Sequence, residues 1–266
     1  MPDQKHVYSG DMKQRAVDTN SLTTRLVINR KYQNFDFSQW LFDRLDVSPG
    51  EQILDVGCGT GAQTLQFLNA IGDHGSVSCL DINQESIDEL LESCDGDQRI
   101  EAVAEDMVEL SNVIGHTFKQ KKYTLAHSSY SLYYSSDRAS VLQSMFDSIY
   151  PFGRIAIFTP TKPHGMVEIA ARFSQIPDAV IDCLDFGSEF LEPEFRKMFW
   201  DVRVDFFQSE MNVKSKDDFI AFYKATTYFD QSALQAMTEF ASEQIKQYGA
   251  IKYQKNGYLI TGINKR

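Results

Sequence analysis

The sequence predicts an α/β fold in which a mostly parallel sheet carries helices on both faces. Short apolar runs typical of buried strands alternate with helix-like segments from residue 51 to about 160. One of these runs, Ile53 to Val56, leads into a turn with three glycines in five residues. The turn is followed by an apolar-periodic segment over 62–70. We expect the rest of the chain to be organised around this strand, glycine turn and helix.

The remaining elements of the core follow in order. Strands are expected near 52–56, 76–81, 100–104, 123–128 and 153–159, with two further strands at 202–207 and 257–263. Helices are expected near 60–71, 84–94 and 137–150, and a short one over 108–114.

Helix-like segments flank this core. Residues 1–45 predict an amino-terminal helical cap of one or two helices, of which the last covers 37–45 and stops at Ser48-Pro49-Gly50. Residues 161–199 carry three prolines among apolar runs and are expected to form a lid. Residues 200–266 hold the final strands with inserted helices. We expect one domain over 1–266, with its core at 50–160.

Composition excludes several classes of protein. The formal net charge of −11 opposes binding to a nucleic-acid backbone, which draws its affinity from clustered Lys and Arg. The four cysteines show no metal-binding spacing, and no apolar run is long enough to cross a bilayer. The amino terminus lacks the apolar segment of a secretory signal, so a cytoplasmic protein is expected.

The glycine turn predicts a cradle for a small molecule. Glycine has no Cβ, so the turn can take positive φ and a ligand can approach the backbone. A helix beginning at about Thr60 would also leave free N–H groups directed at that ligand. The glycines fall as Gly57-x-Gly59-x-Gly61 and not as the G-x-G-x-x-G of dinucleotide-binding proteins, so the pyrophosphate fingerprint is missing.

At these residues the sequence resembles the class I S-adenosylmethionine-dependent methyltransferases. Their first motif, D-x-G-x-G-x-G, is matched by Asp55 and the three glycines, and acidic residues follow the next two strands as Asp81 and Asp106. The resemblance covers about residues 50–160. It implies a Rossmann-like seven-stranded sheet with an antiparallel last strand, S-adenosyl-L-methionine as cofactor, S-adenosyl-L-homocysteine as product, and methyltransferase activity.

The resemblance also implies roles for individual residues. Asp55 would organise the turn and approach the amino group of the methionine part, and Asp81 would hold the ribose hydroxyls. The implied cofactor-binding residues are Asp55, Gly57, Cys58, Gly59, Gly61, Asp81, Ile82, Asp106, Met107 and His127. Asp81 as a plain strand-end residue and Asp106 as a helix cap are the alternatives, and Glu105 competes for the adenine.

The acceptor is expected after the fourth strand, because the carboxyl ends of parallel strands line the ligand crevice. His127 is a candidate general base there, or a hydrogen-bonded residue beside the sulfonium. Tyr130 and Tyr133 are candidates for shaping the pocket, Tyr130 also as a catalytic residue, and His164 is a further candidate base.

Contacts from the amino-terminal segment are also considered. Tyr8, Arg30 or Tyr32 are candidates for contacting the cofactor carboxylate or the acceptor, with ordinary packing as the alternative. No metal is expected, although Asp182 and Asp185 in the lid leave that point open.

The expected function is therefore methyl transfer to an oxygen or nitrogen of a small metabolite. The Asn/Asp-Pro-Pro-Tyr motif of methylases that act on planar nitrogens is absent after the fourth strand, where Ser128-Ser129-Tyr130 stands. Methylation of a protein or RNA is one alternative, and a non-catalytic regulator that binds S-adenosylmethionine is another. Partners are expected to be a small-molecule acceptor, without nucleic acid or membrane.

Overall fold

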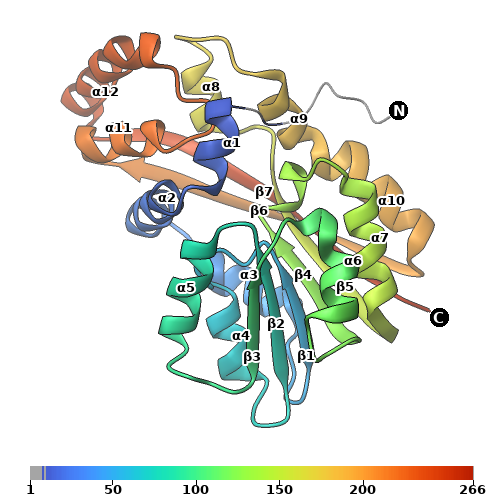
Figure 1. Ribbon diagram of the computed structural model, residues 1–266. Coiled ribbons are helices and arrows are strands. Elements are labelled where there is room, and N and C mark those ends of the chain that lie inside the picture. The colour runs from blue at the N-terminus through green and yellow to red at the C-terminus, as the bar shows by residue number, and fades with distance from the viewer. Residues whose placement is uncertain (1–7, 9, 266) are drawn as a thin grey trace.

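The computed structural model describes residues 8 and 10–265 and has an α/β architecture (Figure 1). The strands in this described part are β1 (Gln52–Val56), β2 (Ser76–Asp81), β3 (Ile100–Ala104), β4 (Tyr123–Ser129), β5 (Ile149–Thr161), β6 (Asp201–Val213) and β7 (Ile251–Ile263). They form one sheet in the order β3-β2-β1-β4-β5-β7-β6. Strand β7 runs antiparallel to both of its neighbours, β5 and β6, and the other strands of this sheet all point in one direction, so the predicted fold class is confirmed.

The helices largely follow the predicted positions. They are α1 (Gly10–Val17), α2 (Thr19–Tyr32), α3 (Phe37–Leu45), α4 (Thr64–Ala70), α5 (Gln84–Ser93), α6 (Leu110–His116), α7 (Arg138–Ser148), α8 (Gly165–Ala170), α9 (Asp178–Phe186), α10 (Glu192–Met198), α11 (Lys216–Lys224) and α12 (Leu234–Tyr248). The predicted start of the first core helix at about Thr60 is wrong. Gly61 takes a φ of +85°, which a right-handed helix cannot include, so α4 starts only at Thr64.

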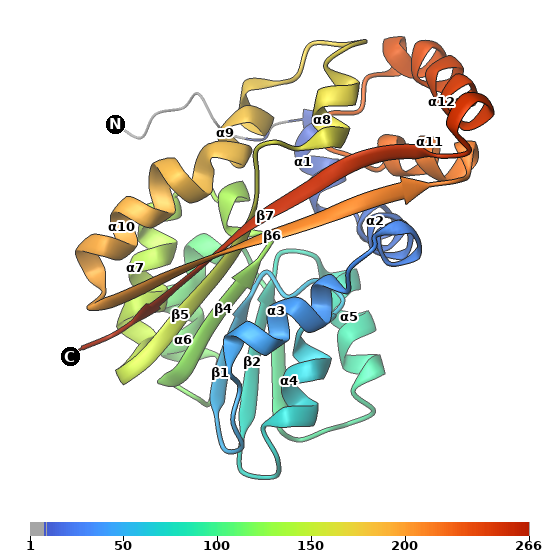
Figure 2. The same cartoon turned by 180° about the vertical axis from the view of Figure 1, so that it is seen from behind.

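Each face of the sheet has its own apolar core. Helices α3, α4 and α5 cover one face, where Trp40, Phe67 and Leu90 pack against side chains of the central strands (Figure 2). Helices α6, α7, α9 and α10 cover the other face (Figure 1). The central strands are thus buried on both sides, which is why they read as nearly continuous apolar runs in the sequence.

A third apolar core lies beyond the carboxyl end of the parallel strands. There β6 and β7 extend past the other strands, and α2, α8, α11 and α12 pack on the extension (Figures 1 and 2). Buried residues of this core include Ile28, Met166, Met211, Phe219 and Met237. We call the assembly of α1, α2, α8, α11, α12 and the outer halves of β6 and β7 the cap.

The structure divides the segment that was expected to be a lid. Its first part, with α8, packs in the cap, and Val180 and Leu184 of α9 pack against Val167 of α8. Helices α9 and α10 also place Cys183, Phe186, Leu191 and Phe195 in the core on the sheet, so this part of the segment covers the sheet as well. The difference arises because the apolar residues of both parts have helical spacing, and spacing alone does not say which surface they cover.

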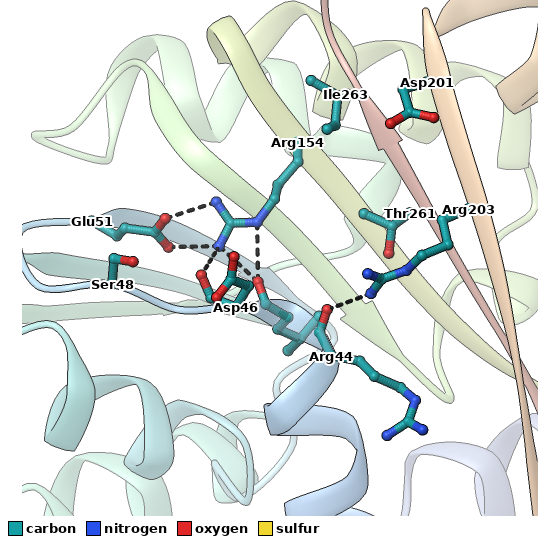
Figure 3. A pocket seen from close by; sticks show the side chains of 10 residues that line it. Arg44, Asp46, Ser48, Glu51, Arg154, Asp201, Arg203, Thr261 and Ile263 are labelled. Atoms are coloured by element: carbon teal, nitrogen blue, oxygen red, sulfur yellow. Dashed lines mark hydrogen bonds and ion pairs between the residues drawn. The ribbon is translucent and has the colours of Figure 1, made fainter.

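At the opposite, amino-terminal end of the sheet, Arg154 connects β5 to the end of α3 and to Glu51, the residue before β1 (Figure 3). From β5 its guanidinium binds both carboxylate oxygens of Glu51, at 2.7 and 3.0 Å. It also donates to the carbonyl oxygens of Leu45 and Asp46 at the end of α3. Both charged side chains are largely buried, 18% and 12% exposed, so this bidentate pair is well shielded from water.

We predict that Arg154→Met lowers the free energy of unfolding by about 2–4 kcal/mol, because it leaves the Glu51 carboxylate and the α3 carbonyls without a donor. Urea denaturation measures the change. Arg203→Met is the control: Arg203 also donates to a carbonyl of α3, that of Arg44 at 2.8 Å, but is 56% exposed, and its loss should cost less than about 1 kcal/mol. Equal losses in the two variants would contradict the prediction.

Candidate active site

The glycine turn lies at the carboxyl end of β1. Its glycines take φ values of +75° at Gly57, +55° at Gly59 and +85° at Gly61. A Cβ on Gly57 would lie 2.2 Å from the Ser131 hydroxyl oxygen, and that hydroxyl donates to the Val56 carbonyl at 2.9 Å. The loops after β1 and β4 therefore interlock in a way that only glycine permits at position 57.

A buried carboxylate, that of Asp55, lies beneath the turn. It is 2% exposed and accepts hydrogen bonds from the Thr64 hydroxyl at 2.7 Å and from Nδ1 of His127 at 3.0 Å. Next to it, a hydrogen bond with Cys79 and burial raise the pKa of the Cys58 thiol. This thiol is therefore protonated and packs as a small apolar group.

His127 lies within β4, at the level of Asp55, and not beyond the strand end. Its ring is 1% exposed and packs edge-on against Phe67 at 5.3 Å between centroids. Nε2 is buried without a hydrogen-bond partner among the described residues, as is the hydroxyl of Ser129 at the end of β4. Two orphaned polar atoms of β4 thus lie next to the glycine turn.

Asp81 ends β2, as predicted, and its two carboxylate oxygens have different partners. Oδ2 accepts from the backbone N–H of Gly59 at 2.8 Å, and Oδ1 accepts from that of Asn83 at 2.9 Å. Burial raises the pKa of this carboxyl against the opposing effect of the two amides. The next side chain, Ile82, is apolar yet 42% exposed. A carboxylate and an exposed apolar surface thus stand together beside the turn.

The Asp106 side chain caps a short helical turn, as in the alternative to its predicted contact with adenine. Its Oδ1 accepts from the Val108 N–H at 3.1 Å and caps the short 3-10 turn Met107–Glu109. Glu105 is exposed and its carboxylate accepts from the Asp106 N–H at 3.0 Å. Met107 packs against the core of the adjacent sheet face. Oδ2 of Asp106 forms no hydrogen bond or ion pair with another residue in the described part of the chain.

The junction of α1 and α2 lies over this region. A Cβ on Gly59 would lie 3.0 Å from Cδ2 of Leu22, so α2 rests directly on the turn. The Asn83 side chain donates to the Val17 carbonyl, and the hydroxyls of Thr19 and Ser86 lie 3.2 Å apart. The amino-terminal helices are therefore attached to the segment that follows Asp81.

Tyr130 leaves β4 in a left-handed conformation, with φ of +56°. Such a conformation is uncommon for a tyrosine and concentrates at functional sites. Its ring packs against Phe37 and Phe158, and its hydroxyl is buried without a partner. Burial raises the pKa of this phenol, so it is a proton donor at neutral pH. Tyr133, by contrast, packs in the core of the sheet.

Lys255 on β7 is a residue that sequence reasoning missed. It is 8% exposed, and its ammonium lies 5.4 Å from the centre of the Tyr130 ring. The available signal was the alternation of β7, which turns Ile251, Tyr253 and Lys255 toward the interior. Burial and the nearby charge of Lys255 lower the pKa of His164 to about 4, so that histidine is neutral.

The amino-terminal candidates have other partners. Tyr8 is buried and donates to the Ala179 carbonyl at 3.3 Å, and Tyr32 donates to Asp218 at 2.6 Å. Arg30 is exposed. The arginine of α2 that points inward is Arg25, which donates to the Ala225 carbonyl at 2.6 Å.

The two lid carboxylates form ion pairs: Asp182 with Arg138 at 2.5 Å and Asp185 with Lys162 at 2.6 Å. Over residues 8 and 10–265, no group of three or more His, Cys, Asp or Glu side chains is arranged to hold a metal ion. In the same part of the chain, no helix combines the length and apolarity needed to cross a membrane.

The sheet order, the antiparallel β7 and the glycine turn after β1 define an α/β protein of the Rossmann-like type. Residues 53–153 match the family model described as a methyltransferase domain. This match supports the assignment of residues 53–153 to the class I S-adenosylmethionine-dependent methyltransferases, which the motif of Asp55 and the three glycines predicted.

Curated relatives match over part of their length. Demethylmenaquinone methyltransferase of Bacillus cereus is 29% identical over 121 residues, which are 45% of this chain and 48% of that protein. A probable cobalt-precorrin-6B C(15)-methyltransferase (decarboxylating) of Thermoplasma acidophilum is 40% identical over 50 residues, 19% of this chain and 25% of that protein. The match thus spans about half of the first relative and a quarter of the second.

Solved structures share the fold at low identity. The [4+2]-cyclase SpnF superposes with a TM-score of 0.58 at 13% identity, over 97% of both chains. Phosphoethanolamine N-methyltransferase 2 of Haemonchus contortus, in complex with S-adenosyl-L-methionine, has a TM-score of 0.58 at 13% identity, over 97% of this chain and 60% of that one.

The residues around the turn fit S-adenosylmethionine, the cofactor of this family. Beside the turn, Nε2 of His127 and the hydroxyl of Ser129 are buried polar atoms without a hydrogen-bond partner, and a bound ligand could supply one. Asp81 and the exposed Ile82 offer a carboxylate and an apolar surface next to each other, as a nucleoside requires. The geometry therefore agrees with the family.

Lys255 should make stability depend on pH. Burial, reinforced by the charge of Arg25, lowers the pKa of its ammonium from the ordinary 10.5 to about 7. Between these pH values the unfolded chain binds more protons at this residue than the folded protein, so the stability of the wild type rises with pH. We predict that Lys255→Met is more stable than wild type at pH 7 and loses this advantage as the pH approaches 10.5.

Urea denaturation of both proteins at pH 7, 8.5 and 10 measures the difference in free energy of unfolding. The exposed Lys252 of the same strand provides the control variant Lys252→Met, whose stability relative to wild type should not change with pH. A difference between Lys255→Met and wild type that stays constant over this range would show that the ammonium is not desolvated.

Proposed function

We propose that the protein transfers the methyl group of S-adenosylmethionine to an oxygen or nitrogen of a small metabolite. The observation that carries this proposal is the enclosed position of the glycine turn, on which Leu22 of α2 rests. Beyond the turn, unpartnered polar groups of β4 and β7 are buried under the cap. A site of this kind suits an acceptor that is small enough to be enclosed with the cofactor.

S-adenosylmethionine, when bound, supplies an electrophilic methyl group on a positively charged sulfur. In our proposal Asp81 holds the ribose hydroxyls and Ile82 packs on the adenine. The adenine edge is held by the free oxygen of Asp106 and the backbone N–H of Met107. The methionine part lies on the turn, which comprises Gly57, Cys58, Gly59 and Gly61 above Asp55.

We assign His127 to the cofactor and not to proton abstraction. Its Nδ1 is bound to Asp55, and its ring is too buried, at 1% exposed, to reach a second molecule beyond the cofactor. Only Nε2 is available, and it lies at the level of Asp55 beneath the turn. Tyr130, with its unpartnered hydroxyl, is the residue we propose for contact with the acceptor.

Two other functions are compatible with the family. Methylation of a protein or RNA is disfavoured by the net charge of −11 and by the enclosing cap. A non-catalytic regulator is the other, and the likeness to a protein named a [4+2]-cyclase is a reminder that the fold hosts more than one function. We further propose that residues 1–266 act as a single methyltransferase domain.

The ribose assignment predicts that Asp81→Ala weakens binding of S-adenosylhomocysteine by about 1.5–3 kcal/mol, through loss of charge-assisted hydrogen bonds. Isothermal titration calorimetry measures the affinity. Asp88→Ala is the control, since Asp88 is an exposed carboxylate of the adjoining α5 that pairs with Gln84 alone. Unchanged binding in a folded Asp81→Ala protein would remove the assignment, and tighter binding of a nicotinamide dinucleotide would argue against the cofactor.

The proposed acceptor class predicts where a labelled methyl group will go. We expect transfer from [methyl-³H]S-adenosylmethionine to the low-molecular-mass fraction of an extract from the source organism. Transfer to the protein or nucleic-acid fraction would favour the macromolecular alternative. Binding of S-adenosylhomocysteine without transfer to any fraction would favour the regulator.

A further inference from the structure

Lys255 is a buried cation that lacks a counter-ion within the chain. Its side chain is 8% exposed, and no carboxylate among residues 8 and 10–265 lies within ion-pair distance of its Nζ. Burying an ammonium without a partner costs free energy, and replacing Lys255 by an apolar residue would remove that cost. A partner from outside the chain explains why a lysine occupies this position.

The surroundings of the ammonium are suited to a ligand with an apolar body. Its Nζ lies 5.4 Å from the centre of the Tyr130 ring and 5.9 Å from that of Phe37. Tyr253 lies on the same face of β7, two residues away. The hydroxyl of Tyr130 is buried without a hydrogen-bond partner, so one donor and two ring faces accompany the charge.

The local charge is positive although the whole chain is acidic. Arg25 of α2 is close enough to oppose protonation of Lys255, and His164 at the start of α8 is close enough to feel the lysine charge. The neutral state of His164 means that it adds no further charge at pH 7. Two cations and no described acid therefore face this part of the interior, which favours an anion.

The carboxylate of the cofactor is not the natural partner of Lys255. The glycine turn follows β1, and β7 lies three strands away in the order β1-β4-β5-β7, about 14 Å across the sheet. Lys255 is also four residues beyond Leu259, the β7 residue level with Gly57, which adds about 13 Å along the strand. The methionine part bound at the turn is too short to span this separation.

We propose that Lys255 binds an anionic group of the methyl acceptor, a carboxylate or a phosphate, and that the acceptor is therefore a small organic acid. This inference rests on the proposed function and specifies its substrate class. The rings of Phe37 and Tyr130 contact the apolar part of the acid, and the Tyr130 hydroxyl donates to it. The anionic group is the anchor, and the atom that receives the methyl group lies nearer the glycine turn.

Binding of matched probes tests the anion site directly. Calorimetry in saturating S-adenosylhomocysteine compares 4-hydroxybenzoate with 4-hydroxybenzyl alcohol, which share a phenol ring and differ in the carboxylate. Wild type should bind the acid at least tenfold more tightly. Lys255→Met should lose this preference, whereas the control Lys252→Met, at an exposed lysine of the same strand, should keep it. No preference in wild type, or a preference that survives in Lys255→Met, overturns the proposal.

Two further measurements separate this proposal from the function on which it rests. S-adenosylhomocysteine should bind Lys255→Met within twofold of wild type, and a tenfold loss would assign Lys255 to the cofactor carboxylate and overturn the proposal. The labelled small-molecule product should be retained by an anion exchanger at pH 8, and a neutral product overturns it as well. Absence of any labelled small molecule would contradict the proposed function alone, because the probe preference still decides whether the anion site exists.

Discussion

The structure around the glycine turn, at the carboxyl end of β1, depends on how the buried Asp55 carboxylate is hydrogen-bonded. A charge that is 2% exposed is stable only if donors reach it, and here they come from Thr64 and His127. Thr64 donates from the first residue of α4, and His127 donates from β4 at the level of Asp55. The glycine turn is held between these anchors, and Ser131 closes it from the loop after β4. A substitution that removes either donor would therefore disturb the turn through the interior of the sheet.

The two long strands β6 and β7 connect this edge to the cap. Residues 256–263 of β7 pair with β5, whereas 251–255 pair with β6 alone and lie in the cap core. Lys255 is thus the first residue of β7 beyond the part shared with the parallel sheet. Its position lets the cap contribute a charge to the region that Tyr130 faces at the end of β4. The proposed cofactor and acceptor sites accordingly draw on different cores of the same sheet.

The sequence was sufficient for the strands and the motif, because a strand buried on both faces and a glycine turn are local patterns. It was insufficient where distant residues decide. The left-handed φ of Gly61 delays α4, and apolar spacing did not reveal that α9 and α10 pack on the sheet. Lys255 was missed because its partner, Tyr130, lies 125 positions away in the sequence. The strand register that brings the two residues together is not encoded by any local pattern. The roles of individual site residues stay predictions.

The acceptor region also limits which groups can exchange protons. Burial raises the pKa of the Tyr130 and Tyr253 phenols, so both are donors at neutral pH, and His164 with a pKa of about 4 is neutral. Lys255, with a pKa of about 7, is the group whose charge responds to a ligand. An anion beside it stabilises the ammonium, so binding of an acidic acceptor is coupled to proton uptake. The bound acceptor would thereby provide a counter-ion for Lys255. The free-energy cost of burying its ammonium would be offset only in the complex with the acceptor.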